Sequence, residues 1–182
     1  DVYKRQVPIC LDTQDTEEII QAVKNIAPGF GGINLEDISA PRCFEIEERL
    51  KEMLDIPVFH DDQHGTAIVV LAGIINGLRV TGKKKEDCRV VVNGAGSAGV
   101  AITKLLLTYG FKHVTMCDRE GIIGKDYPNL NWMQKKMTEV TNLENTSGTL
   151  ADALRGADIF VGVSAPNIVT PEMVSSMNKD AI

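Results

Sequence analysis

The chain has 182 residues, of which 43% are hydrophobic, and its 19 basic and 25 acidic residues give a net charge of −6. This composition is typical of a soluble globular protein, and the length allows one domain and part of another. The acidic balance argues against nucleic acid or an anionic membrane as the main partner, and the longest apolar run, residues 67–75, is too short to cross a bilayer.

The two ends of the sequence look cut. Residues 1–6 bear no relation to the rest of the chain, and one way of encoding them resembles the end of a transposon adaptor used in sequencing libraries. We therefore expect the protein proper to start near Val7. At the other end the chain stops at Ile182, where the pattern predicts that a strand is beginning.

In the first half of the chain, the period of the apolar residues predicts strands that alternate with helices. The expected elements are a strand at 7–11, a helix at 17–26, a strand at 30–35, a helix after Pro41, a strand at 57–60 and a helix at 66–78. The last of these helices is apolar all round, so we expect it to be buried. The basic loop after it, residues 79–87, contains Gly82 and is the best boundary by composition. We interpret its lysine run as solvated.

The second half alternates more regularly. The expected elements are a strand at 89–93, a helix at 98–109, a strand at 113–117, a helix near 131–140, a short helix after Thr149, a strand at 158–163 and a helix opened by Thr170. This alternation predicts an α/β fold with a doubly wound parallel sheet of the Rossmann type.

A glycine-rich loop, Gly94-Ala95-Gly96-Ser97-Ala98-Gly99, follows an apolar strand and opens a helix. The first glycine of such a loop allows a tight turn, the second lets the backbone approach a pyrophosphate, and the third lets helix and strand pack closely. A glycine turn that binds no nucleotide is the alternative. The coincidence of loop, strand and helix favours a dinucleotide site.

An acidic residue supports the same interpretation. Asp118 ends the next predicted strand, 19 residues after Gly99, where a carboxylate can accept hydrogen bonds from the adenosine ribose. Asp118 would repel a 2′-phosphate, which favours NAD. Arg119 beside it could receive that phosphate, so NADP stays open as the cofactor.

Two pairs of carboxylates, Glu36-Asp37 and Asp61-Asp62, each follow a predicted strand. Ligands of open α/β sheets bind beyond the carboxyl ends of strands, so these acids can converge on one crevice. An all-oxygen set selects Mg²⁺ or Mn²⁺ over zinc. Adjacent strand residues point to opposite faces, so Glu36 and Asp37 can share an ion only if the strand has already bent into a loop. Solvated loop acids are an equally open interpretation.

The histidines and cysteines suggest less chemistry. His60 and His64 have HxxxH spacing, but residues 57–60 look extended and no glutamate follows the first histidine. Packing or support of metal ligands is therefore favoured over zinc binding.

The four cysteines include no CxxC pair, and we expect no signal peptide. Three of them fall in or beside apolar runs, which predicts reduced, buried thiols in a cytoplasmic protein.

Four segments read together resemble the bacterial malic enzymes: GGINLEDISAP at 31–41, FHDDQHGTA at 59–67, VNGAGSAG at 92–99 and GVSAPNIVTPEM at 162–173. The resemblance runs in order along the chain from about Val7. It implies that residues 7–65 are the C-terminal part of a smaller substrate and metal domain. Residues 66–182 would then be an NAD(P)-binding Rossmann domain, incomplete at its C-terminus.

The resemblance also implies an activity, the oxidative decarboxylation of L-malate to pyruvate and CO₂ with reduction of NAD or NADP and a need for Mg²⁺ or Mn²⁺. In that family the metal is held by a glutamate, the aspartate after it and a later aspartate, which fall on Glu36, Asp37 and Asp62. Asp61 matches an acid that supports the catalytic lysine. Homodimers or higher homo-oligomers are implied by analogy.

The resemblance places Ser164 and Asn167 among the cofactor contacts. It also places the family's general acid, a tyrosine, and general base, a lysine, upstream of Val7. We therefore expect residues 7–182 to bind better than they catalyse. Two alternatives stay open: another Rossmann hydroxy-acid dehydrogenase, which would not explain the acidic pairs, and a dinucleotide-binding module without catalysis.

Overall fold

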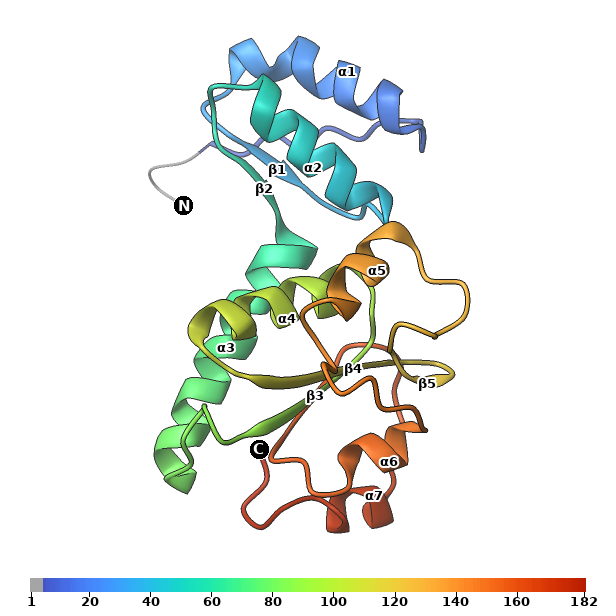
Figure 1. Cartoon of the computed structure of the whole chain (residues 1–182). Coiled ribbons are helices and arrows are strands. Elements are labelled where there is room, and N and C mark those ends of the chain that lie inside the picture. The colour runs from blue at the N-terminus through green and yellow to red at the C-terminus, as the bar shows by residue number, and fades with distance from the viewer. Residues whose placement is uncertain (1–4) are drawn as a thin grey trace.

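The computed structural model describes residues 5–182 and consists of two α/β parts joined by one long helix (Figure 1). Residues 1–4, most of the stretch attributed to an adaptor, lie outside the described residues. The first part contains α1 (Thr16–Ile26), η1 (Ala27–Gly29), β1 (Ile33–Leu35), α2 (Arg42–Met53) and β2 (Val58–His60). The joining helix is α3 (Asp61–Thr81). The second part contains β3 (Arg89–Asn93), α4 (Ser97–Tyr109), β4 (His113–Asp118), β5 (Gly121–Ile122), α5 (Trp132–Thr138), α6 (Leu150–Leu154), β6 (Ile159–Gly162) and α7 (Pro171–Ser175).

In the first part, β1 and β2 pair in parallel, and Leu35 lies opposite His60 at their carboxyl ends. The buried face of α1 follows helical spacing and packs with α2 and both strands into one core, formed by Ile19, Ile20, Val23, Leu35, Ile46, Leu50 and Val58. The register therefore brings the residues after Leu35 and after His60 to the same edge.

The predicted strand at 7–11 is wrong. These residues form no strand, and Val7, Ile9 and Leu11 are 60%, 47% and 40% exposed. The apolar run alone was the basis of the prediction, but the first sheet consists of β1 and β2 and does not pair with it.

Helix α3 begins directly after β2, five residues earlier than the sequence pattern predicts, and it ends at Gly82 in the left-handed conformation (φ 70°). Acidic residues in a first turn are favoured by the positive end of the helix dipole, which explains why Asp61 and Asp62 are helical. One face of α3 packs along α4 in the main core.

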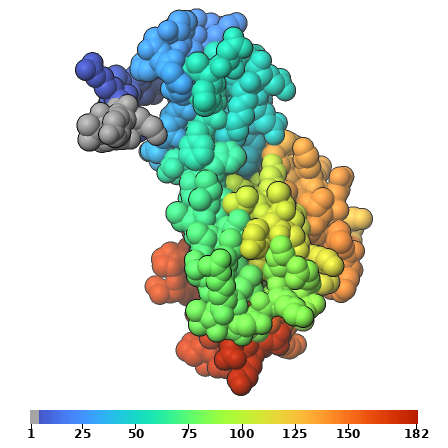
Figure 2. All heavy atoms as spheres, turned by 90° about the vertical axis from the view of Figure 1, so that its left-hand side faces the viewer, coloured from blue at the N-terminus to red at the C-terminus, as the bar shows by residue number. Residues whose placement is uncertain are grey.

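The prediction that this helix is buried all round is wrong. Ile68, Val69 and Val80 are 56%, 66% and 87% exposed, and Figure 2 shows the length of α3 on the surface beside α4. Among the described residues α3 is long and apolar enough to span a membrane by length and composition. Its packing against α4 accounts for one apolar face as it would in a core helix.

The main sheet has the strand order β5-β4-β3-β6, with β3, β4 and β6 parallel and β5 antiparallel to β4. Alternation along β3 places Val90 and Val92 in the core with α3 and α4, while Val91 faces α6 on the opposite side of the sheet. Helices therefore cover both faces, and the prediction of a doubly wound, Rossmann-type parallel sheet is confirmed.

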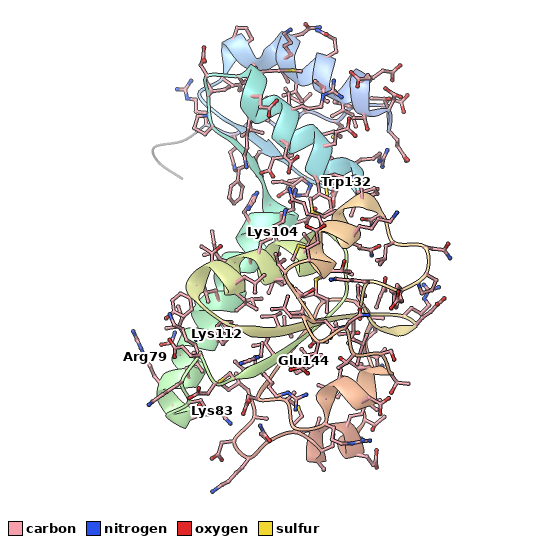
Figure 3. The ribbon with its side chains drawn as sticks, viewed as in Figure 1. Arg79, Lys83, Lys104, Lys112, Trp132 and Glu144 are labelled. Atoms are coloured by element: carbon pink, nitrogen blue, oxygen red, sulfur yellow. The ribbon has the colours of Figure 1, made fainter. Side chains whose placement is uncertain are left out.

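The two parts also touch where α2 meets α4 and α5. The Phe44 ring packs edge-on against Trp132 with centroids 6.1 Å apart, and Lys104 Nζ lies 5.7 Å from the Phe44 centroid. Figure 3 shows Lys104 and Trp132 at this junction. Burial lowers the pKa of Lys104, which its attraction to nearby glutamates only partly opposes.

At the opposite end of the sheet, Asp158 is a buried carboxylate at the start of β6. It accepts hydrogen bonds from Lys83 Nζ at 2.8 Å, the Arg89 backbone N–H at 2.9 Å and Asn178 Nδ2 at 3.0 Å. The lysine run is thus not simply solvated: Lys85 Nζ also donates to the Tyr109 carbonyl at 2.6 Å. This cluster joins the loop after α3, the start of β3 and the end of the chain.

The cysteines give a first testable prediction. All four are free; Cys43, Cys88 and Cys117 are buried and Cys10 is exposed. Burial raises the pKa of Cys43 to about 11 and of Cys117 to about 12. Because the thiolate is the reactive form, iodoacetamide at pH 8 should label Cys10 alone in the folded chain and all four in denaturant. Mass spectrometry of the labelled peptides checks this, and rapid native labelling of Cys117 would contradict it.

Candidate dinucleotide and metal site

The three glycines of the loop after β3 have different surroundings. Gly94 has φ 120°, and a Cβ built on it would lie 2.7 Å from the Val163 carbonyl oxygen. A Cβ on Gly99 would lie 1.6 Å from the Gly94 carbonyl oxygen. Around Gly96 no atom lies within 4 Å of such a Cβ. The fold itself therefore requires the first and third glycines, whereas the second faces open space, as it must if a pyrophosphate approaches the backbone.

The glycine loop lies at the point where the order of strand addition in the sheet reverses. The chain leaves β3 toward β4 on one side and returns to β6 on the other, and ligands of open α/β sheets bind beyond the carboxyl ends of the strands at such a point. Gly96 is the N-cap of α4 and Ser97 and Ala98 form its first turn, with no side chain capping their N–H groups. These free donors and the helix dipole suit a diphosphate. The residues fit a dinucleotide.

Asp118 is the last residue of β4, as the sequence pattern predicts for the end of this strand. Asp118 is partly exposed at the end of the strand, and its Oδ1 accepts a hydrogen bond from the Arg119 backbone N–H at 2.7 Å. The Arg119 side chain is exposed. Nearby, the Tyr127 hydroxyl accepts from the Glu120 N–H at 3.3 Å, and burial raises the pKa of Tyr127.

The loop after β6 follows the strand that pairs with β3 on the side opposite β4. Ser164 and Asn167 are exposed there, and Asn167 has a left-handed backbone (φ 60°). The Ser164 Oγ accepts a hydrogen bond of 2.7 Å from Asn93 Nδ2. Asn93 is the last residue of β3 and only 4% exposed.

The structure brings together the segments that carry two of the three predicted metal ligands, Asp37 and Asp62. The Asp37 backbone N–H donates to Asp62 Oδ2 at 3.2 Å, across 25 residues of sequence. Asp37 has φ 56°, so the chain has left β1 and bent into a loop. Such a bend is required if the adjacent residues Glu36 and Asp37 are to share an ion. The Glu36 carboxylate instead accepts from Asn34 Nδ2 at 3.3 Å.

The expectation that three carboxylates already meet is therefore not met. In residues 5–182 there is no group of three or more His, Cys, Asp or Glu side chains placed to hold one metal ion. The carboxylates of Glu36 and Asp62 accept from separate donors, Asn34 Nδ2 and the Asp37 N–H respectively. The all-oxygen chemistry of Glu36, Asp37 and Asp62 still fits Mg²⁺ or Mn²⁺, and the ligand set stays a prediction.

The neighbouring acid and histidines occupy defined positions. Asp61 folds back over the next turn of α3, where a Cβ on Gly65 would lie 2.3 Å from its Oδ1. His60 is buried at the end of β2. His64 Nε2 lies 2.6 Å from Glu47 Oε1, which also accepts from Lys51 Nζ at 2.8 Å. The zinc pairing suggested by HxxxH is not formed, and His64 links α3 to α2.

Sequence reasoning missed two polar residues, Asn93 and Glu47. Asn93 ends a run of buried valines, whereas Glu47 lies in a charged run and is nevertheless on the buried face of α2. A buried polar side chain is normally hydrogen-bonded, so Asn93 could have been flagged as having a specific partner. The identity of that partner required the fold.

Comparisons with known proteins match both parts of the chain. A family model described as the malic enzyme NAD-binding domain matches residues 63–181, and one described as the malic enzyme N-terminal domain matches residues 5–51. The chain is 59% identical to an NAD-dependent malic enzyme of Geobacillus stearothermophilus over 96% of its own length and 37% of that protein. It is 51% identical to a bifunctional malic/malolactic enzyme of Bacillus subtilis over 96% of itself and 43% of that protein.

Solved structures give the same result. The NAD-dependent malic enzyme of Thermotoga maritima superposes with a TM-score of 0.91 at 51% identity, covering 94% of this chain and 46% of that one. The malic enzyme of Pyrococcus horikoshii gives 0.89 at 42% identity, covering 97% and 43%. The chain thus spans less than half the length of these relatives. Family models and relatives together confirm the resemblance seen in the sequence, and the chain belongs to the malic enzyme family.

Proposed function

We propose that this protein takes part in the oxidative decarboxylation of L-malate to pyruvate and CO₂, with NAD or NADP as the hydride acceptor and Mg²⁺ or Mn²⁺ as a cofactor. The observation that supports the proposal is that one helix connects the acidic segments to the glycine loop. Asp37 contacts Asp62 in the first turn of α3, and α3 packs along α4, which begins at the glycine loop.

The residues of the chain have distinct roles in this proposal. The first turn of α4 binds the pyrophosphate, and Asp118 orients the adenosine ribose. Glu36, Asp37 and Asp62 would hold the divalent ion, which would supply Lewis-acid polarisation of the malate C2 oxygen. Asp61, at the exposed start of α3, would support the family's lysine base, which the resemblance places outside residues 7–182. The position of Asp118 favours NAD, because a carboxylate there repels a 2′-phosphate.

The test measures binding of the metal, the dinucleotide and malate. The chain should bind Mn²⁺, followed by electron paramagnetic resonance, and NADH, followed by fluorescence. L-Malate should bind only when Mn²⁺ is present, because the metal supplies its main anchor. Asp62→Asn should weaken Mn²⁺ at least tenfold, since one charged ligand is lost, and should leave the NADH affinity within twofold.

Two results would contradict the proposal. Malate binding that does not depend on Mn²⁺, or is unchanged in Asp62→Asn, would favour a metal-independent hydroxy-acid dehydrogenase. NADH binding without any malate binding would favour a dinucleotide module. Glu48→Gln, an exposed acid on α2 outside the predicted ligand set, is the matched control for loss of one negative charge.

Two further features belong to the proposal. We infer a homo-oligomer by analogy with the family, supported by the apolar surface of Ile68, Val69 and Val80 on α3. We also infer a cytoplasmic location, supported by the four free thiols. Sedimentation velocity over a range of concentrations tests the first inference, and a single monomeric species would contradict it.

A further inference from the structure

We propose that Asn93 is a positioning residue for the nicotinamide half of the dinucleotide and acts through Ser164. The inference rests on the proposed function, because it requires that a nicotinamide dinucleotide binds at the glycine loop. It concerns a side chain that would not touch the cofactor itself.

The first step is the contact. Asn93 is 4% exposed, and its amide donates to the exposed Ser164 Oγ at 2.7 Å. The backbone supports the same approach, because the Val163 N–H donates to the Asn93 carbonyl at 2.9 Å. Within the described part of the chain, no other side-chain hydrogen bond reaches residues 163–169. Asn93 is thus the side-chain tie between the centre of the sheet and this loop.

The second step is the chemistry of the position. The preceding residues of β3, Val90 to Val92, are buried and apolar, so a valine or leucine at position 93 would suit the sheet. A buried amide is unfavourable unless it is hydrogen-bonded. We therefore attribute the polar side chain at position 93 to its hydrogen bond with the loop after β6, and not to packing of the sheet.

The third step identifies which half of the dinucleotide lies near the loop after β6. The strand order places β4 on one side of β3 and β6 on the other. Asp118 at the end of β4 receives the adenosine, and the glycine loop after β3 receives the pyrophosphate. The remaining half would then lie toward β6, where Ser164 and Asn167 are exposed in the loop that follows the strand. A loop held in place before binding loses less entropy when the ligand binds.

The experiment compares two ligands and three variants. NADH reports both halves of the site, whereas ADP reports the adenosine and pyrophosphate half alone. In Asn93→Ala we expect NADH to bind about tenfold more weakly and ADP to bind within twofold of the unmutated chain. Ser164→Ala should weaken NADH at least as much. The double variant should be no weaker than Ser164→Ala, because the two residues act through one bond.

Several results would overturn the inference. Equal weakening of NADH and ADP in Asn93→Ala would mean that the residue only supports the glycine turn. Unchanged NADH affinity in Asn93→Ala, or additive losses in the double variant, would mean that no coupled bond exists. Should Asn93→Ala fail to fold, an unchanged NADH affinity in the surface variant Ser164→Ala would overturn it alone. Failure of the unmutated chain to bind NADH would remove the proposed function, and this inference with it.

Discussion

Replacing Gly99 with alanine should destabilise the protein by about 3 kcal/mol, the upper end of the usual range for overpacking. The added Cβ would lie 1.6 Å from the Gly94 carbonyl oxygen, and a backbone atom cannot move aside as a flexible side chain can. Helix propensity acts in the opposite direction, because alanine is favoured over glycine within a helix by about 1 kcal/mol. The steric term is larger, so the net change is a loss. Urea unfolding followed by circular dichroism measures it.

Gly96→Ala is the matched control for this prediction. A Cβ there meets no atom within 4 Å, so the stability should fall by about 1 kcal/mol or less, mainly because alanine is a poorer N-cap. The methyl group would occupy the space through which the pyrophosphate approaches the backbone, so NADH affinity should fall at least tenfold. The reverse pattern, with Gly96→Ala unstable and Gly99→Ala tolerated, would show that the loop has another conformation.

Replacing Asp158 with alanine should destabilise the protein by about 3 kcal/mol, because loss of one partner leaves a largely buried Lys83 unpaired. It also leaves the Arg89 N–H and Asn178 without their acceptor. Lys83→Met should cost about 1 kcal/mol, since Asp158 keeps its two other donors. Thermal and urea unfolding of both variants measure this difference, and equal losses would contradict the asymmetry.

The same carboxylate predicts a pH dependence. Burial acts to raise the pKa of Asp158, but hydrogen bonds from Lys83, the Arg89 N–H and Asn178 together outweigh it, so the pKa lies below its ordinary value. The folded state then binds fewer protons than the unfolded state, and the stabilisation is present above about pH 4 and lost as the pH falls through the lower folded-state pKa. The stability difference between the unmutated chain and Asp158→Ala should therefore shrink below about pH 4.

The main sheet was predictable because its signals are local and agree with one another. The strands β3, β4 and β6 follow from apolar runs, and the glycines, caps and following helices occur at the spacing that a βαβ unit requires. The two-residue strand β5 was not predicted, because Gly121 and Ile122 are too short a run to give a pattern. The prediction at 7–11 failed because an apolar run says nothing about whether a partner strand exists. The error for α3 has a similar cause: composition cannot tell which faces of an apolar helix other elements cover.

The candidate site was predictable in part. The positions of Asp37 and Asp62 follow from the rule that parallel strands end at one edge, and the structure brings their segments together. The direction of the Glu36 side chain depends on a nearby Asn34 donor, which the carboxylate pattern does not reveal. Asn93 and Glu47 are defined by partners 71 and 17 residues away, respectively, so their pairings could be read only from the fold.

The unbroken helix α3 has a mechanical consequence. With no kink between Asp61 and Thr81, the acidic first turn cannot swing independently of the helix body that packs on α4. A movement of the first α/β part toward the second would have to pivot at the extended backbone of His60, where β2 ends. Such a rotation would strain the edge-on ring contact between Phe44 and Trp132. Phe44 also belongs to an apolar cluster with Ala95, Val100 and Met133 of the second part, so this whole contact, and not the ring pair alone, opposes the rotation.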